Sequence, residues 1–258
     1  MESLSAAREG SGRVSLPPPY TARYYAEKWG VFTAAVLIHT VGYVSLNKLY
    51  HPSHFVDVTT ALDRAIPVRA EWSWFYEALF VMPICLAPIR DLARMWRAAA
   101  AVVATCVTAW VFFVLFPVST EGFRPASVEV TDVHTLLLGF IYQTDGTGTC
   151  FPSLHVAISV LFGLIGMHQW KLWGHLLFLV GLLVSVSTLF TKQHYIADVT
   201  AGLLLAAATY RGVYHGAFLD RWARFRVSEG AEQDAREERA EPEGVWALAP
   251  SLLKALRR

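Results

Sequence analysis

Long runs of apolar residues alternate with polar segments along most of the chain. The runs cover residues 29–47, 72–89, 98–116, 153–170, 172–190 and 195–214. A bilayer core about 30 Å thick is crossed by about 20 apolar helical residues, so each run suits one membrane-spanning helix. Trp and Tyr lie near the ends of several runs, as they do at membrane interfaces. The pattern predicts an all-α, polytopic membrane protein, a bundle of six transmembrane helices.

Basic residues gather in alternate polar segments, which indicates how the bundle is oriented. They precede the first run, separate the second from the third, and follow the sixth: Arg8, Arg13, Arg23 and Lys28; Arg90, Arg94 and Arg97; Arg211, Arg221, Arg224 and Arg226. Cytoplasmic loops are enriched in Lys and Arg, so both termini are expected in the cytoplasm. The segments 48–71, 117–152 and 191–194 then face outward, to a periplasm or a lumen.

Composition supports a multi-pass integral membrane protein and excludes several other classes. Apolar residues make up 54% of the chain, and the net charge of +1 leaves no basic face for nucleic acid. Three cysteines without close spacing predict neither a disulfide framework nor a zinc finger. We expect a flexible cytoplasmic tail over 1–28, a catalytic membrane domain over 29–215, and over 216–258 a cytoplasmic linker ending in a short amphipathic helix or a frayed tail.

Two short strings place a histidine where a loop meets an apolar run. The first is Phe151-Pro152-Ser153-Leu154-His155, and the second runs from Gln193 through His194 to Asp198. Residues four apart share a helix face, so Asp198 could orient His194 for nucleophilic attack on phosphorus. The alternative is a buried ion pair that only fixes the sixth run. A carboxylate in a membrane span is costly and favours the functional interpretation.

His155 and nearby cations complete the predicted site. Ser153 is a natural N-cap, and the free amides of a helix start bind anions, so His155 could act there as general acid. Arg124 could clamp a phosphate or anchor its loop to lipid head groups, and Lys192 could add positive charge or be an ordinary loop lysine. The glycine-rich segment 145–149 allows close approach to a ligand or is a simple turn.

These blocks, Arg124-Pro125, Pro152-Ser153-Leu154-His155 and His194 with Asp198, resemble the three signatures of the type 2 phosphatidic acid phosphatase superfamily. The resemblance covers about residues 117–214. It implies a six-helix membrane enzyme without metal or cofactor, whose substrates are membrane lipids. It also implies His194 as nucleophile, Asp198 as its orienting acid and His155 as general acid. Arg124 and Ser153 would bind phosphate, with Lys192 as a third candidate.

The chain departs from that pattern at three positions. Pro117 and Thr188 stand where the superfamily's phosphatases usually carry a lysine and an arginine, and Leu154 replaces a common glycine. The blocks around His155 and His194 resemble more closely the branch containing inositol phosphorylceramide synthase, and sphingomyelin synthases share the His-Tyr pair. That branch transfers a phospho-head-group between lipids. We therefore expect a lipid phosphotransferase, with a lipid phosphate phosphatase as the alternative.

Other interpretations explain fewer residues. A lipid-phosphate transporter would bind near the midplane between repeats, and no repeat is evident. His51 and His54 lack further ligands for a metal. His39 and Glu77, polar residues inside apolar runs, line a lipid slot or form hydrogen bonds between helices. The sequence sets no oligomeric state, donor head group or acceptor.

Overall fold

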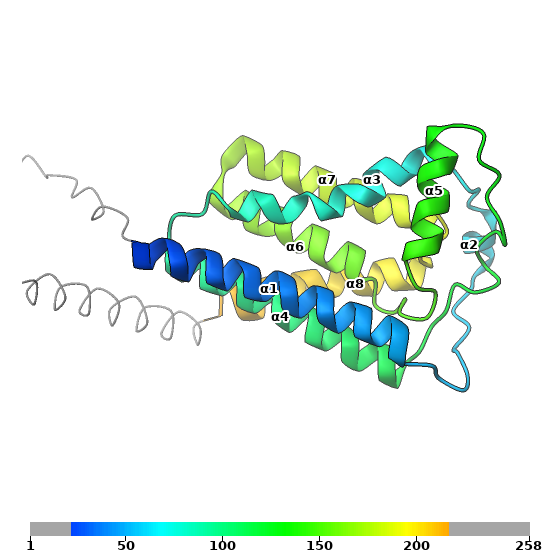
Figure 1. Cartoon of the computed structure of the whole chain (residues 1–258), viewed down its shortest axis with the longest axis horizontal. Helices are drawn as coiled ribbons and strands as arrows, with labels where there is room; N and C mark the ends of the chain where they lie inside the picture. The colour runs from blue at the N-terminus through cyan, green and yellow to red at the C-terminus, as the bar shows by residue number, and fades with distance from the viewer. Residues whose placement is uncertain (1–21, 217–258) are drawn as a thin grey trace, which may run out of the picture.

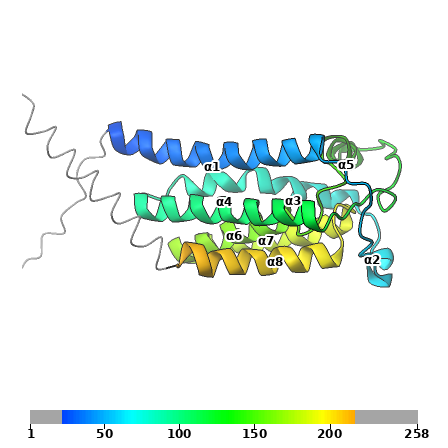
Figure 2. The same ribbon diagram turned by 90° about the horizontal axis from the view of Figure 1, so that it is seen from below.

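A computed structural model describes residues 22–216, which form an elongated helical bundle (Figure 1). No strand occurs in this range, so the all-α prediction is confirmed. The long helices run side by side along the bundle in both views (Figure 2), and their bounds are α1 Ala22–Leu49, α4 Leu92–Leu115, α6 Leu154–Gln169, α7 Lys171–Phe190 and α8 Ile196–Thr209, which continues as a π-helical turn, Tyr210–Tyr214.

The second predicted run is a succession of short helices rather than one long helix. The helix α3, Ser73–Glu77, lies between 3-10 turns at Ala70–Trp72, Ala78–Phe80 and Met82–Leu86. Pro83 stands in the first turn of the last of these, and Pro88 follows it. A proline has no backbone N–H to donate, so it interrupts an α-helix. Residues 70–89 nevertheless extend along the bundle next to α7 (Figure 1).

Four helices in the described range are long and apolar enough to cross a membrane: Ala22–Leu49, Leu92–Leu115, Lys171–Phe190 and Ile196–Tyr214. The helix α6 is apolar but shorter. It is buried around most of its circumference, as a helix in the centre of a bundle is expected to be. The chain is thus an integral membrane protein of apolar helices, whereas the count of six crossings stays a prediction.

Two short helices lie within the predicted outer loops. The helix α2, Ala61–Ala65, is capped by Thr60, and α5, Val133–Thr144, is capped by Asp132; each start has a capping box. Hydropathy alone predicts loops for both segments, because α2 is very short and α5 is shorter than a membrane span. In Figure 1, α5 lies across one end of the bundle, and α2 is at the same end.

The helix ends that are predicted to be cytoplasmic lie at one end of the bundle, and the predicted outer segments lie at the other. The α1 start and the α8 continuation lie at the end opposite α2 and α5 (Figures 1 and 2). At this end Lys28 Nζ donates to the Ala87 carbonyl at 2.6 Å, and Arg94 donates to Gln169 at 2.9 Å. Which end faces the cytoplasm stays a prediction.

Only small parts of the two predicted terminal segments, 1–28 and 216–258, lie within the described residues. The helix α1 begins at Ala22, so the last residues of the predicted 1–28 tail are helical. The rest of that tail and nearly all of 216–258, with its amphipathic segment, lie outside the described residues.

Small residues let α6 and α7 pack backbone against backbone. A Cβ atom added to Gly181 would lie 2.7 Å from the Ser159 carbonyl oxygen, and one added to Gly174 would overlap the Gly166 carbonyl. Close approach at small residues is a general means of helix association in membranes, where the hydrophobic effect between helices is absent.

Gly181→Ala is expected to destabilise the bundle, and Gly139→Ala is the matched control. Both changes improve helix propensity, but a Cβ at Gly139 meets nothing within 4 Å. Overpacking costs about 1–3 kcal/mol, which lowers Tm by about 2–4 °C per kcal/mol in a chain of this size. Thermal unfolding in detergent measures both; an equal Tm for the two variants would contradict the close packing.

Candidate active site

His194 and Asp198 form a buried pair where α8 begins. The Nδ1 atom of His194 lies 3.3 Å from Asp198 Oδ2, and both side chains are almost fully enclosed. The same Oδ2 accepts a hydrogen bond from the Tyr195 amide at 2.9 Å. Because α8 starts at Ile196, His194 lies in the preceding turn, not on a helical face as the spacing suggested. Asp198 reaches it by folding back over the helix start.

The turn between α7 and α8 holds His194 rigidly. The amides of Gln193 and His194 both donate to the Thr188 carbonyl, at 2.9 and 3.2 Å. Lys192 has a φ of 56°, in the left-handed region that few non-glycine residues occupy. Such a conformation persists only where its surroundings fix it.

The Lys192 ammonium is engaged by the protein itself. Its Nζ donates to the Asp63 carbonyl at 2.7 Å and lies 4.3 Å from the centre of the Phe123 ring. Burial lowers the pKa of Lys192, and the nearby Asp63 opposes this shift. Asp63 also accepts a hydrogen bond from the Ile196 amide at 2.8 Å. Lys192, the cation predicted to help bind phosphate, is therefore close to His194 in sequence, but its ammonium group is already bonded to α2.

His155 lies in the first turn of α6 and faces His194. The two ring centroids are 5.7 Å apart, with the planes inclined by 55°. Ser153 caps the helix, since its Oγ accepts from the Val156 amide at 3.3 Å, as its sequence position predicted. The Ser153 amide donates to the Asp198 carbonyl at 3.1 Å. This backbone bond places the starts of α6 and α8, and hence the two imidazoles, next to each other.

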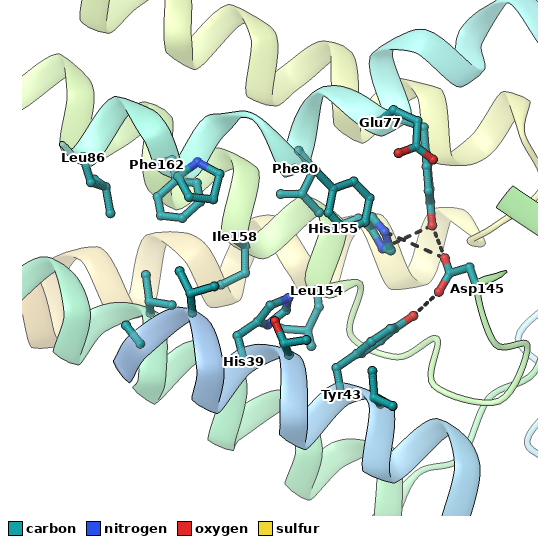
Figure 3. Close-up of a pocket in the computed structure, with 18 of the residues that line it drawn as sticks. His39, Tyr43, Glu77, Phe80, Leu86, Asp145, Leu154, His155, Ile158 and Phe162 are labelled. Atoms are coloured by element: carbon teal, nitrogen blue, oxygen red, sulfur yellow. Dashed lines mark hydrogen bonds and ion pairs between the residues drawn. The ribbon is translucent and has the colours of Figure 1, made fainter. Parts of the chain in front are cut away.

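Asp145, which follows α5, connects His155 to two tyrosines. The hydroxyls of Tyr43 and Tyr76 both donate to its carboxylate, and Oδ2 lies 3.8 Å from His155 Nε2 (Figure 3). The Tyr76 hydroxyl is also 3.4 Å from His155 Nδ1. Burial alone would raise the pKa of the Asp145 carboxyl, but His155, the two tyrosine hydroxyls and Arg124 lower it. Asp145 is therefore an anion beside the second histidine.

Arg124 and Gln193 bring further donors to the same end. Arg124 donates to the carbonyls of Asp145 and Gly146, each at 3.1 Å, and to the Gln193 side chain. Arg124 Nε, Gln193 Nε2 and Asp198 Oδ1 are buried without a protein partner. Buried polar atoms are usually hydrogen-bonded, so these three atoms have capacity left to bind a ligand or a water molecule.

The structure thus brings His155, His194 and Asp198 together, and Arg124 joins them through Gln193. Sequence analysis gave Gln193 no role, although it directly precedes His194. Asp145 begins the glycine-rich segment for which the sequence predicts either close approach to a ligand or a simple turn, with no role for its carboxylate. Its position at the end of an apolar helix was the available signal. Nothing in the sequence indicated Tyr43 or Tyr76, because a tyrosine in an apolar run is ordinary. These contacts form only in the folded bundle.

A cavity of about 540 Å³ is lined by His155 and not by His194. It lies between α1, the 76–86 segment, α4, α5 and α6 (Figure 3). Both His39 and Glu77 line it, as one of the two sequence interpretations proposed. His39 also contacts the Cys106 thiol of α4 at 3.4 Å, so the second interpretation, a contact between helices, holds for it too.

One group in the described part of the chain has the composition of a metal site. Cys150, His194 and Asp198 each offer a ligand atom, all within 4.8 Å of one another. Burial, and next the Asp198 charge, raise the pKa of the Cys150 thiol, whereas metals bind the thiolate. Its Sγ donates to the Thr147 carbonyl at 3.0 Å. The donor set therefore suits a metal poorly.

The fold and these side chains define a helical membrane protein with a pair of facing histidines at one end. The family model described as the PAP2 superfamily matches residues 51–211, more than half of the chain. The chain belongs to this superfamily, which supports lipid phosphatase or phosphotransferase activity on membrane lipid phosphates. No curated protein and no solved structure matches the chain.

Purified protein is expected to contain no stoichiometric zinc. The protonated Cys150 thiol would have to lose its proton in a buried, anionic setting before it could bind the ion. Elemental analysis of protein purified without chelator measures the content, with Cys150→Ser as the control. One zinc per chain that disappears in Cys150→Ser would reassign the group as a metal centre.

Proposed function

We propose that the protein is a metal-independent lipid phosphotransferase that moves a phospho-head-group between lipids through a phosphohistidine at His194. The observation that carries this proposal is the arrangement of the two imidazoles, 5.7 Å apart, with Asp198 on one and Asp145 beside the other. A nucleophile and a general acid must approach phosphorus from opposite sides, and two facing rings are suited to these roles.

In the first step His194 attacks phosphorus. Asp198 holds the Nδ1 side of the ring, which leaves Nε2 to form the N–P bond and stabilises the positive charge that develops. The P–O bond to the lipid alcohol breaks, and protonated His155 gives its proton to that oxygen. The 3.8 Å between His155 Nε2 and Asp145 is too long for a direct hydrogen bond, so the proton is available to a ligand.

In the second step His155 acts as base. It takes the proton from an acceptor hydroxyl, the new O–P bond forms, and the N–P bond to His194 breaks. A lipid alcohol as acceptor gives a transferase of the inositol phosphorylceramide synthase or sphingomyelin synthase type. Water as acceptor gives the second candidate, a lipid phosphate phosphatase, which superfamily membership favours equally. Exclusion of water decides between them.

The phosphate oxygens have donors available on the protein. Arg124 Nε and Gln193 Nε2 are buried N–H groups without partners, next to each other in the structure. A charged guanidinium and an amide that need no reorganisation stabilise a developing anion well. Ser153 at the α6 start and Lys192 would supplement them by small movements away from Val156 and Asp63. We assign Arg124 and Gln193 as the principal phosphate ligands.

We place the active site on the outer face of the membrane, periplasmic or lumenal, with both termini in the cytoplasm. The basic residues at the starts of α1 and α4, which lie at the opposite end of the bundle, support this orientation through the positive-inside rule. Transport of a lipid phosphate is a weaker explanation, because it would leave the paired histidines and their carboxylates without a role.

His194→Ala is expected to lower turnover at least about a thousandfold, because the nucleophile is lost. Wild-type protein given phosphatidylinositol labelled in its phosphate should retain acid-labile, base-stable label, and the variant should retain none. With ceramide present, the label should appear in a new lipid, whereas release of labelled inositol phosphate alone would favour hydrolysis, the reaction of the phosphatase. Full turnover in a folded His194→Ala variant would rule out the mechanism.

Asp145→Asn is expected to lower the rate at neutral pH by about tenfold to a hundredfold, since the anion that favours protonated His155 is lost. The rate should recover as the pH is lowered, because acid restores the proton that the carboxylate no longer stabilises. Rates measured across a range of pH test this recovery, with a variant at an exposed carboxylate, Asp57→Asn, as control. A uniform loss at every pH would limit Asp145 to a packing role.

A further inference from the structure

We infer that the 540 Å³ cavity beside His155 binds the hydrocarbon part of the lipid alcohol that leaves or attacks phosphorus. This inference rests on the proposed phosphoryl transfer and assigns one of its substrates a place in the fold. The volume falls within the usual range for small-molecule sites, about 300–1,000 Å³.

The cavity wall is apolar except at identifiable points. Side chains of α1, the 76–86 segment, α4 and α6 supply most of it, including Phe32, Leu86, Val102 and Phe162. Polar groups gather where it meets Tyr43, Glu77, Asp145 and His155, and His39 lies one turn of α1 before Tyr43 (Figure 3). A long apolar wall with a polar end matches an amphiphile that has one hydroxyl and a hydrocarbon tail.

The polar end of the cavity is the end at which the acid–base group acts. His155 Nε2 and Asp145 Oδ2 are 3.8 Å apart, and both residues line the cavity. A hydroxyl oxygen beside Nε2 would receive or give the proton there. His194, Arg124 and Gln193 do not line the cavity, although the His194 ring centre is only 5.7 Å from that of His155. The proposal therefore puts the phosphate beside His194 and the alcohol in the cavity, with His155 in contact with both.

The cavity reaches the apolar outer surface of the bundle. Val36 and Phe80 line it and are also 38% and 65% exposed. These residues come from α1 and from the 78–80 turn, and α1 packs mainly against α4. A lipid chain could therefore enter sideways from the bilayer, between α1 and the 78–86 segment. Such access favours a membrane lipid over a water-soluble alcohol.

One cavity then serves both halves of the reaction. The alcohol of the donor takes the His155 proton as its P–O bond breaks, and it leaves through the cavity. The acceptor alcohol enters the same space, returns a proton to His155 and forms the new O–P bond. Since the two alcohols share a site, they bind in succession and never together.

A carbene-forming diacylglycerol, which carries a diazirine in its chain, tests the site by direct labelling of the full-length protein. Label is expected on residues 32–44 and 76–86. Ala35→Phe, which fills the cavity, should reduce that labelling about tenfold. Ala34→Phe, the neighbouring exposed position outside the cavity, should leave it unchanged. Equal labelling in both variants, or label confined to residues outside the cavity, would overturn the assignment.

A second pair of variants covers the case in which Ala35→Phe does not fold. Val36→Trp obstructs the exposed rim of the cavity, whereas Leu37→Trp alters an exposed position that does not line it. Only Val36→Trp should reduce labelling. His194→Ala protein should label as the wild type does, because binding needs no phosphoenzyme. Turnover by His194→Ala would thus refute the proposed function. The labelling pattern alone tests whether the cavity binds the lipid alcohol.

Discussion

The position of one buried carboxylate, Asp198, determines how the candidate site is assembled. Its Oδ2 contacts His194 Nδ1 and accepts from the Tyr195 amide, while its backbone carbonyl accepts from the Ser153 amide. One residue thus orients an imidazole, caps α8 and fixes the start of α6. A buried charge costs several kcal/mol unless it is paired and hydrogen-bonded, which makes these contacts mutually dependent. The contacts confirm the structural interpretation of this pair, a buried contact that fixes the start of α8, and its role in catalysis stays a prediction.

The second histidine has a different environment, and the contrast suits two different roles. His194 is held by Asp198 in a tight turn that hydrogen bonds to the Thr188 carbonyl fix. His155 instead borders the cavity and lies 3.8 Å from Asp145, whose carboxylate is held by hydrogen bonds from two tyrosine hydroxyls. A nucleophile needs one fixed orientation, whereas an acid–base group must exchange its proton with a ligand that enters and leaves.

Pro117 and Thr188, which replace the lysine and the arginine usual in the superfamily's phosphatases, form structural hydrogen bonds here. The Pro117 carbonyl accepts from the Val56 amide at 2.8 Å, which joins the two outer loops. Thr188 is fully buried and supports the His194 turn through its carbonyl. Two cations expected from the resemblance are thus replaced by neutral residues. The positive charge near the site comes from Arg124 and Lys192, and Lys192 is already bonded to Asp63.

The sequence by itself determined the helical membrane class, the two histidine strings and their arrival at one end of the bundle. Apolar run length and the spacing of basic residues are local properties, so they can be read without a fold. The tertiary structure alone decided that Asp145 meets His155, that Gln193 meets Arg124, and that a cavity opens beside them. These contacts join residues distant along the chain, and no local pattern encodes such pairings. It also showed that the second apolar run is a succession of short helices around Pro83, because a hydropathy run records apolarity and not helical continuity.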